Sequence, residues 1–273
     1  MMVGDGDGAY PSWLEIAGAS SRFVGRVGSA RPIPSITVGA DHVSFRLPKQ
    51  YESRTDDLVF EGQLQGYLLV GTTTLEDGSP TAWRGVRAPD LKREGAPNWG
   101  PTQELIGPDL AGWTARSDDM PNNWRAVDGM LVNDAVGSDL VTVDRFMDFK
   151  LVAEYKYPPG SNSGIYLRGR YEFQILDDFG HAPGVGTSGA IYGFIKPTSN
   201  AVQPADEWNV AEITLLGRLV TVVLNGETVV DAGEIPGITG GALDCDEGVP
   251  GPLFLQGDHG PVVFRRLSLT PAV

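Results

Sequence analysis

Residues Ser161 to Asp178, SNSGIYLRGRYEFQILDD, decide the fold class of this chain. The stretch is typical of two consecutive β-strands, because apolar and polar side chains alternate along it. One face is apolar and is expected in the core: Ile165, Leu167, Phe173 and Ile175. The opposite face is polar: Tyr166, Arg168, Glu172 and Gln174. This second face predicts a groove on a sheet that binds a polar ligand.

The rest of the chain also favours strands over helices. Its 36 Gly and 20 Pro are spread over 273 residues and interrupt helices throughout. The longest stretch without either, Ser138 to Tyr157, is rich in Val, Leu, Phe and Tyr, which favour strands. Asn225-Gly226 follows the apolar run Leu219 to Leu224 and is the strongest hairpin signal, because Asn-Gly tolerates positive φ angles. The sequence therefore predicts a nearly all-β protein with antiparallel neighbouring strands.

The length of the chain indicates two domains. Residues 1–100 hold short alternating segments that suit a small β-barrel or meander. Ala88 to Pro101, APDLKREGAPNWGP, is rich in Pro and charge and is taken as the boundary. Residues 101–273 then contain about ten predicted strands, including Ala190 to Ile195, which suit a two-layer sandwich of jelly-roll type.

Charge and hydropathy limit the classes of partner. The net charge is −14, with 10 basic and 12 acidic groups in residues 1–100 and 11 and 23 in residues 101–273. A domain this acidic repels a phosphate backbone, so no nucleic-acid partner is expected. No apolar run approaches the length of a membrane span, and the N-terminus lacks a signal-peptide pattern. The compartment stays open, with secretion or a periplasmic location expected if a signal peptide has been removed.

Metal signals in the sequence are weak. Asp244, Asp246 and Gly248 resemble the opening of a calcium loop, yet the later ligands of such a loop are missing. His181 and His259 are the two histidines of the second domain. His259 lies in LQGDHGP, where flanking glycines let the backbone approach a ligand, although an ordinary turn histidine fits equally well. The metal is therefore left unknown, with a divalent ion such as calcium as the candidate.

Several ordered segments together resemble a known family. They are GWTARSDDMPNNWRAVDGMLVN, SNSGIYLRGRYEFQILDD, GAIYGFIKP, EWNVAEITLLGRLVTVVLNG and GPLFLQGDHGPVVFRRLSL. Over about Gly107 to Pro271 the chain resembles the 3-keto-disaccharide hydrolase domain. The resemblance implies a concanavalin A-like β-sandwich and activity on glycosides that carry a ketone at carbon 3. Residues 1–100 resemble the extra β-domain that some members carry.

The chemistry implied by this resemblance needs three kinds of group. A ketone at carbon 3 acidifies the hydrogen on carbon 2, so a base forms an enolate that expels the glycosidic oxygen from carbon 1. Water then adds to carbon 1. The route requires a base, a charge stabiliser at the enolate oxygen and an acid for the leaving group. Direct hydrolysis is the alternative outcome.

Candidate residues for these roles are chosen by residue type and face. The base is expected to be Glu172 or Asp177, and the charge stabiliser Arg168 or Lys196. His259 is expected to act as the acid or to bind a divalent metal. The other residues expected to bind substrate are Glu154, Asn162, Tyr166, Gln174, Tyr192 and Gln256.

Two other function classes compete with the enzyme. A non-catalytic carbohydrate-binding module would hold the sugar with aromatic faces and amide side chains. An interaction scaffold would use the first domain to contact another protein. The concentration of ionisable groups favours the enzyme, because such groups are costly to keep together unless something binds or reacts there. A carbohydrate, a 3-keto-glycoside, is therefore the expected partner.

Overall fold

The structure, a computed structural model, describes residues 1–273 apart from the side chain of Asp7. The chain forms two compact units. The first comprises Met1–Pro89 and Gly237–Glu247, and the second comprises Asp90–Pro236 and Gly248–Val273. One division thus falls inside the boundary region 88–101 that was proposed from the sequence.

The segment Gly237–Glu247 packs with the first unit, although its position in the chain placed it with residues 101–273. The N–H of Gly241 donates to the carbonyl oxygen of Arg26 at 2.9 Å. A Cβ atom on Gly237 would lie 2.1 Å from Nε1 of Trp13. Glycine is required for this close approach, so the glycines of the segment serve packing as well as turns.

The first unit consists of short antiparallel strands and two single turns of 3₁₀-helix. They are β1 (Met2–Val3), η1 (Gly6–Gly8), β2 (Tyr10–Pro11), β3 (Trp13–Glu15), η2 (Gly18–Ser20), β4 (Arg22–Val24), β5 (Arg31–Pro32), β6 (Ser35–Val38), β7 (His42–Leu47), β8 (Leu58–Gln65), β9 (Leu68–Thr74) and β10 (Pro80–Val86). The main sheet has the order β2-β1-β10-β9-β8-β7-β6, and β3-β4-β5 form a smaller one. Strands β6 to β10 follow one another as a meander. Their apolar side chains pack into a core that includes stacked Phe45 and Phe60.

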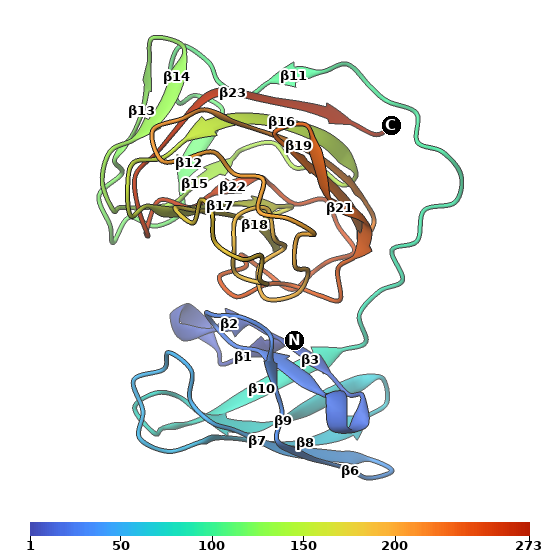
Figure 1. Ribbon diagram of the computed structural model, residues 1–273. Helices are drawn as coiled ribbons and strands as arrows, with labels where there is room; N and C mark the ends of the chain where they lie inside the picture. The colour runs from blue at the N-terminus through green and yellow to red at the C-terminus, as the bar shows by residue number, and fades with distance from the viewer. The chain divides into compact units, whose positions relative to one another are not determined.

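The second unit is a sandwich of two antiparallel sheets (Figure 1). Its strands are β11 (Gln103–Glu104), β12 (Trp113–Ala115), β13 (Trp124–Val127), β14 (Met130–Asn133), β15 (Leu140–Thr142), β16 (Phe149–Lys156), β17 (Asn162–Leu167), β18 (Tyr171–Leu176), β19 (Asn209–Leu216), β20 (Leu219–Leu224), β21 (Glu227–Glu234), β22 (Phe254–Leu255) and β23 (Val262–Pro271). The larger sheet has the order β13-β14-β23-β16-β19-β20-β21, with β11 paired to β23. The smaller sheet has the order β12-β15-β22-β17-β18.

The two sheets bury their apolar faces against each other. Tyr155 of β16 and Phe173 of β18 meet edge to face between the sheets, with ring centroids 6.4 Å apart. The apolar face of β17 and β18 is fully buried, as the alternation predicted. The expected all-β class and concanavalin A-like jelly-roll sandwich are confirmed. Within the described residues, no helix is long and apolar enough to cross a membrane.

Local turn chemistry confirmed one prediction and corrected another. The Asn225-Gly226 hairpin joins β20 to β21, and both turn residues have positive φ, 52° and 83°. The strand expected at Ala190 to Ile195 is instead a tight turn, in which Ile191 and Ile195 form an isolated bridge. Gly193, with φ of 73°, permits this reversal, which the apolar run AIYGFI concealed.

Candidate active site

Glu172 lies on β18 directly opposite Tyr166 of β17, on the face of the small sheet that points away from the sandwich core. The hydroxyl of Tyr166 donates to Oε2 of Glu172 at 2.9 Å. Glu172 is only 4% exposed. Burial raises the pKa of its carboxyl group to about 8, against the opposing effects of the Tyr166 hydrogen bond and the charge of His259. Glu172 is therefore a carboxyl group that takes up and releases a proton near neutral pH.

The pH dependence of stability tests the burial of Glu172. Its pKa is raised from 4.5 to about 8 in the folded chain, which therefore keeps a proton that the unfolded chain has released. This contribution to stability is complete below pH 4.5 and is lost as pH rises through about 8. We expect the free energy of unfolding of the parent to fall relative to Glu172→Gln by on the order of 4 kcal/mol across this window, measured by urea unfolding. Parallel pH profiles for the two proteins would contradict the raised pKa.

Gly164 of β17 leaves the space that the Glu172 side chain occupies. A Cβ atom on Gly164 would lie 2.9 Å from Oε1 of Glu172 and 3.1 Å from its Cγ. Both distances are shorter than an ordinary contact, so a side chain at position 164 must displace the carboxyl group. The absence of a side chain here thus sets the position of Glu172.

For the 3-keto-glycoside substrate that the sequence resemblance implies, with Glu172 as the expected base, replacing Gly164 with Ala is expected to lower turnover by about ten- to a hundredfold. Displacement of a reacting group by about 1 Å has effects of this size. Circular dichroism and the unfolding transition should stay close to those of the parent, since the carboxyl end of Glu172 can rotate. Gly112→Ala is the matched control, because a Cβ atom there meets nothing within 4 Å. Equal turnover by both variants and the parent would show that the position of Glu172 is irrelevant to the reaction.

The loop between β22 and β23 is bonded to two buried side chains, those of Asn133 at the end of β14 and Asp139 just before β15. Oδ1 of Asp139 accepts the N–H groups of Gly257 at 2.9 Å and Asp258 at 3.3 Å. The amide of Asn133 donates to the carbonyl oxygens of Gly257 and Gly260 at 3.4 and 3.3 Å. Four hydrogen bonds therefore anchor the loop that carries Asp258 and His259.

His259 and Asp258 form an ion pair on this loop, with Nδ1 of the imidazole against Oδ1 of the carboxylate. The His259 side chain is 48% exposed. The hydrogen bond to Asp258 raises the pKa of His259, and the charges of Asp258, Glu172 and Asp139 add to this rise. His259 is thus a half-exposed proton donor that senses the charge of the buried Glu172.

Glu172, Tyr166, Asp139, Asp258 and His259 form a cluster of polar side chains, to which Arg116 adds a second cation. Its guanidinium donates to Oδ2 of Asp139 at 3.0 Å and lies 4.9 Å from the ring centroid of Phe254. Phe254 stacks on Tyr166, with ring centroids 4.2 Å apart. Burial raises the pKa of Asp139, and the charge of Asp258 adds to the rise. The aromatic pair therefore connects Arg116 with the Tyr166–Glu172 hydrogen bond.

Four other predicted residues lie around Glu172. Asn162 and Gln256 share the face of Gly164 and Tyr166, and their side-chain oxygens are buried without a hydrogen-bond partner among the described residues. Gln174 is 3% exposed, and its amide donates to the carbonyl oxygen of Gly186 at 3.4 Å. The N–H of Tyr192 donates to the Glu172 carbonyl oxygen at 2.9 Å, which places the turn of Tyr192 beside β18.

Arg168 does not share the face of Glu172, contrary to the sequence prediction. The strand ends at Leu167, and Arg168 follows in the turn with φ of 54°. Its guanidinium donates to the carbonyl oxygen of Gly217, the hydroxyl of Tyr171 and the sulfur of Met147. The turn ends the alternation on which the prediction depended, and Arg168 is fully buried away from that face.

Within the described residues, no hydrogen bond or ion pair joins the three further predicted residues to Glu172, His259 or Arg116. Oδ2 of Asp177 accepts the N–H of Gly160 at 2.7 Å and closes the turn before β17. Glu154 points away from the smaller sheet and accepts a hydrogen bond from Arg265 at 2.7 Å. Lys196 is exposed. These residues were predicted from the chemistry of their side chains, and the sequence around them did not show in which direction each side chain points.

Sequence reasoning missed Arg116, which follows β12, and Asp139, which precedes β15. Arg116 lies in the segment GWTARSDD, which is one of those that carried the family resemblance, and this resemblance was the one sequence signal that could have identified it as a site residue. No local pattern marked Asp139. Among the described residues, no group of three or more His, Cys, Asp or Glu side chains is arranged to hold a metal ion. The calcium-like pattern at Asp244 gains no support from this arrangement.

A family model and a curated relative point to the same family. A model of the family described as "3-keto-alpha-glucoside-1,2-lyase-like domain" matches residues 101–270. A 3-keto-disaccharide hydrolase from Bacteroides thetaiotaomicron is 26% identical over 161 residues, which cover 46% of this chain and 56% of that protein. The chain thus spans about half the length of this curated relative.

Solved structures support the sandwich fold. A protein from Parabacteroides distasonis, provisionally described as a glycosyl hydrolase, is 26% identical with a TM-score of 0.52 and covers 66% of this chain and 94% of its own. A second protein from the same organism with the same description is 21% identical with a TM-score of 0.53, covering 63% of this chain and 94% of its own. At that identity the second likeness concerns the fold alone.

Proposed function

The chain belongs to the family of 3-keto-alpha-glucoside-1,2-lyase-like domains, and from this membership we propose that it cleaves the glycosidic bond of 3-keto-glycosides. The observation that carries the proposal is the buried carboxyl group of Glu172, whose pKa is raised to about 8. A base that removes a proton next to a ketone works best when its pKa lies near the working pH. An ordinary surface carboxylate, with a pKa near 4.3, is a much weaker base.

The proposed reaction begins with elimination. Deprotonated Glu172 takes the hydrogen on carbon 2, and the electron pair passes into the enolate of the carbon-3 ketone. The enolate then re-forms the ketone while the bond from carbon 1 to the glycosidic oxygen breaks, and the leaving oxygen takes a proton from His259. Water adds across the new double bond, with hydroxyl to carbon 1 and hydrogen to carbon 2. No oxidant or reductant is needed for these steps.

The cations of the cluster are proposed to stabilise the negative charge that develops on the enolate oxygen. Protonated His259 supplies positive charge that acts on Glu172, and Arg116 adds a second positive charge over the Phe254 ring that stacks on Tyr166. They take the place of the Arg168 or Lys196 expected from the sequence. Preformed cations at a developing oxyanion stabilise the transition state more than the ground state. Asp139 acts as a positioning residue, because it holds both Arg116 and the backbone at Asp258.

Buried acceptor oxygens support recognition of a sugar. The side-chain oxygens of Asn162 and Gln256 have no hydrogen-bond partner among the described residues. Leaving such an atom buried and unsatisfied costs about 1–3 kcal/mol, which a sugar hydroxyl group would recover by donating to it. Because Glu172 is only 4% exposed, the proposal also requires neighbouring side chains to move when a sugar ring binds.

A reaction in deuterated water tests the proposal. We expect the protein to cleave a 3-keto-disaccharide, to leave the corresponding unoxidised disaccharide intact, and to incorporate deuterium at carbon 2 of the product. Cleavage with carbon 2 still carrying its original hydrogen would indicate direct hydrolysis. Binding of the keto-sugar in calorimetry with no product would favour the carbohydrate-binding module. A parallel reaction with a chelator separates metal-dependent from metal-independent turnover.

A further inference from the structure

Most of the large exposed apolar side chains of the first unit line one cavity. Five large apolar residues that are 47–81% exposed line it: Ile16, Val38, Leu64, Tyr67 and Val86. The cavity is lined entirely by residues of the first unit, including part of Gly237–Glu247. Concentration of exposed apolar surface in a hollow is typical of a binding site, since isolated apolar residues on a surface need no explanation.

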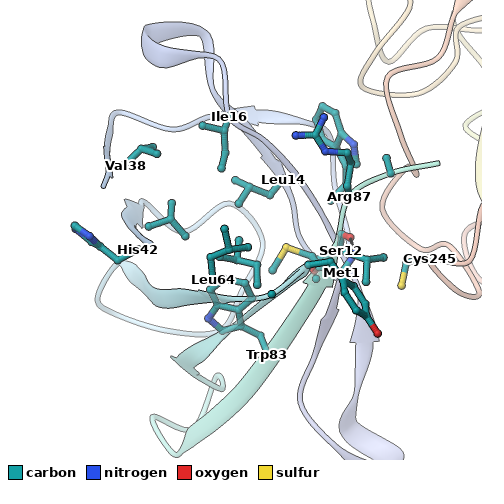
Figure 2. Close-up of a pocket in the computed structure, with 18 of the residues that line it drawn as sticks. Met1, Ser12, Leu14, Ile16, Val38, His42, Leu64, Trp83, Arg87 and Cys245 are labelled. Atoms are coloured by element: carbon teal, nitrogen blue, oxygen red, sulfur yellow. Dashed lines mark hydrogen bonds between the residues drawn. The ribbon is translucent and has the colours of Figure 1, made fainter. Parts of the chain in front are cut away.

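The cavity has a volume of about 810 Å³ and an apolar wall (Figure 2). Its inner lining includes Leu14, Val43, Leu69 and Trp83, which also belong to the core of the unit or pack against it. Nε1 of Trp83 donates to the carbonyl oxygen of Thr72 at 3.1 Å, so the indole brings no unsatisfied donor to the cavity. Sites for small molecules commonly have volumes of about 300–1,000 Å³ and mainly apolar walls.

Four acidic or basic side chains line the cavity, and some of them already interact with other residues of the chain. They are Asp41, His42, Arg87 and Glu247. The Asp41 side chain is 83% exposed and lies 3.9 Å from Nδ1 of His42. Glu247 is 4% exposed and has an interaction partner. Arg87 is exposed, and no hydrogen bond or ion pair of its guanidinium is found within the described part of the chain.

We propose that this cavity binds a small amphipathic molecule, whose apolar body lies among Val38, Leu64 and Trp83 and whose anionic group pairs with Arg87. The apolar wall supplies most of the binding free energy, because burial of apolar surface contributes about 25 cal/mol per Å². Arg87 supplies orientation and a preference for anions, since an exposed ion pair contributes only about 0–1 kcal/mol. The site is independent of the proposed cleavage reaction, which belongs to the second unit.

Two fluorescent probes of similar shape test the proposal on the full chain. One is 8-anilinonaphthalene-1-sulfonate, which is anionic, and the other is its neutral counterpart, N-phenyl-1-naphthylamine. We expect both to bind with one site per chain and to slow alkylation of Cys245, the single cysteine of the chain, which also lines the cavity.

Variants locate the bound probe. Val38→Glu is expected to weaken both probes about tenfold or more, because it places a charge in the apolar wall. Val27→Glu is the matched control, since Val27 is also exposed, at 49%, but does not line the cavity. Arg87→Gln is expected to weaken the anionic probe about threefold and to leave the neutral probe unchanged.

Three outcomes would overturn the proposal. Unchanged probe binding and Cys245 alkylation in Val38→Glu would place the probe elsewhere. Equal losses in Val38→Glu and Val27→Glu, accompanied by a changed circular dichroism spectrum, would indicate binding to a partly unfolded chain. A doubled mass in solution that Val38→Glu returns to the monomer would identify a second copy of the chain as the occupant. Turnover of a 3-keto-glycoside should be the same in all these variants, so a failure here leaves the proposed function standing.

Discussion

Replacing Glu172 with Gln is expected to lower cleavage of the proposed 3-keto-disaccharide substrate by about a thousandfold or more, the largest effect expected from a single substitution in this protein. The amide keeps the size of the side chain and its contact with Tyr166 but cannot take the proton from carbon 2. The variant should still bind the keto-sugar in calorimetry, because Asn162 and Gln256 are unchanged. Exchange of the carbon-2 hydrogen with deuterated water should be lost together with cleavage.

The control for this variant is Glu154→Gln. Glu154 lies on the other sheet, points away from the core and pairs with Arg265, so its variant should cleave the keto-sugar like the parent. If Glu172→Gln retains carbon-2 exchange, the base is another group. If it loses cleavage but retains exchange, Glu172 acts at the leaving group instead.

Replacing His259 with Asn is expected to lower cleavage of a disaccharide by about a hundredfold, because general acid catalysis contributes factors of this order. The loss should shrink for a 3-keto-glycoside with a 4-nitrophenyl leaving group, which departs without a proton. Glu172→Gln should stay inactive towards both substrates. This difference in leaving-group dependence separates the acid from the base.

The pH profile provides a second readout for His259. In the proposed mechanism the active form carries deprotonated Glu172 and protonated His259, so turnover is expected to follow a bell-shaped pH profile. It requires release of the proton of Glu172, whose pKa is raised to about 8, and is lost as the imidazolium of His259, whose pKa is also raised, gives up its proton. Because each group senses the charge of the other, the two apparent values belong to the pair. His259→Asn should lose the descending limb, whereas His181→Asn, which alters an exposed histidine, should keep the profile of the parent.

The buried cluster also connects Glu172 with the loop of His259. Tyr166, Phe254, Arg116 and Asp139 form a continuous chain of contacts from Glu172 to the loop of His259. Carboxyl groups this close together raise each other's pKa, and the cations offset part of the cost. Such arrangements are characteristic of functional sites, since a stable fold alone does not require them.

The sequence by itself determined the fold class and part of the candidate site. Alternation along β17 and β18 placed Tyr166 and Glu172 on one face and Phe173 in the core, because the direction of a strand side chain depends only on its position modulo two. Asn225-Gly226 determined a hairpin, because few other residue pairs adopt two positive φ angles. These are local properties of the backbone, so a single sequence contains them.

Only the tertiary structure decided which charged groups meet. Arg168 does not lie on the predicted face, because it forms part of the turn after β17. Asp139 and Arg116 are brought together by the pairing of β12 with β15, which are separated in the chain. The same holds for Gly237–Glu247, which joins the first unit, and for the burial that raises the pKa of Glu172. Contacts and desolvation depend on which surfaces come together in space, and the local pattern of a sequence does not encode that.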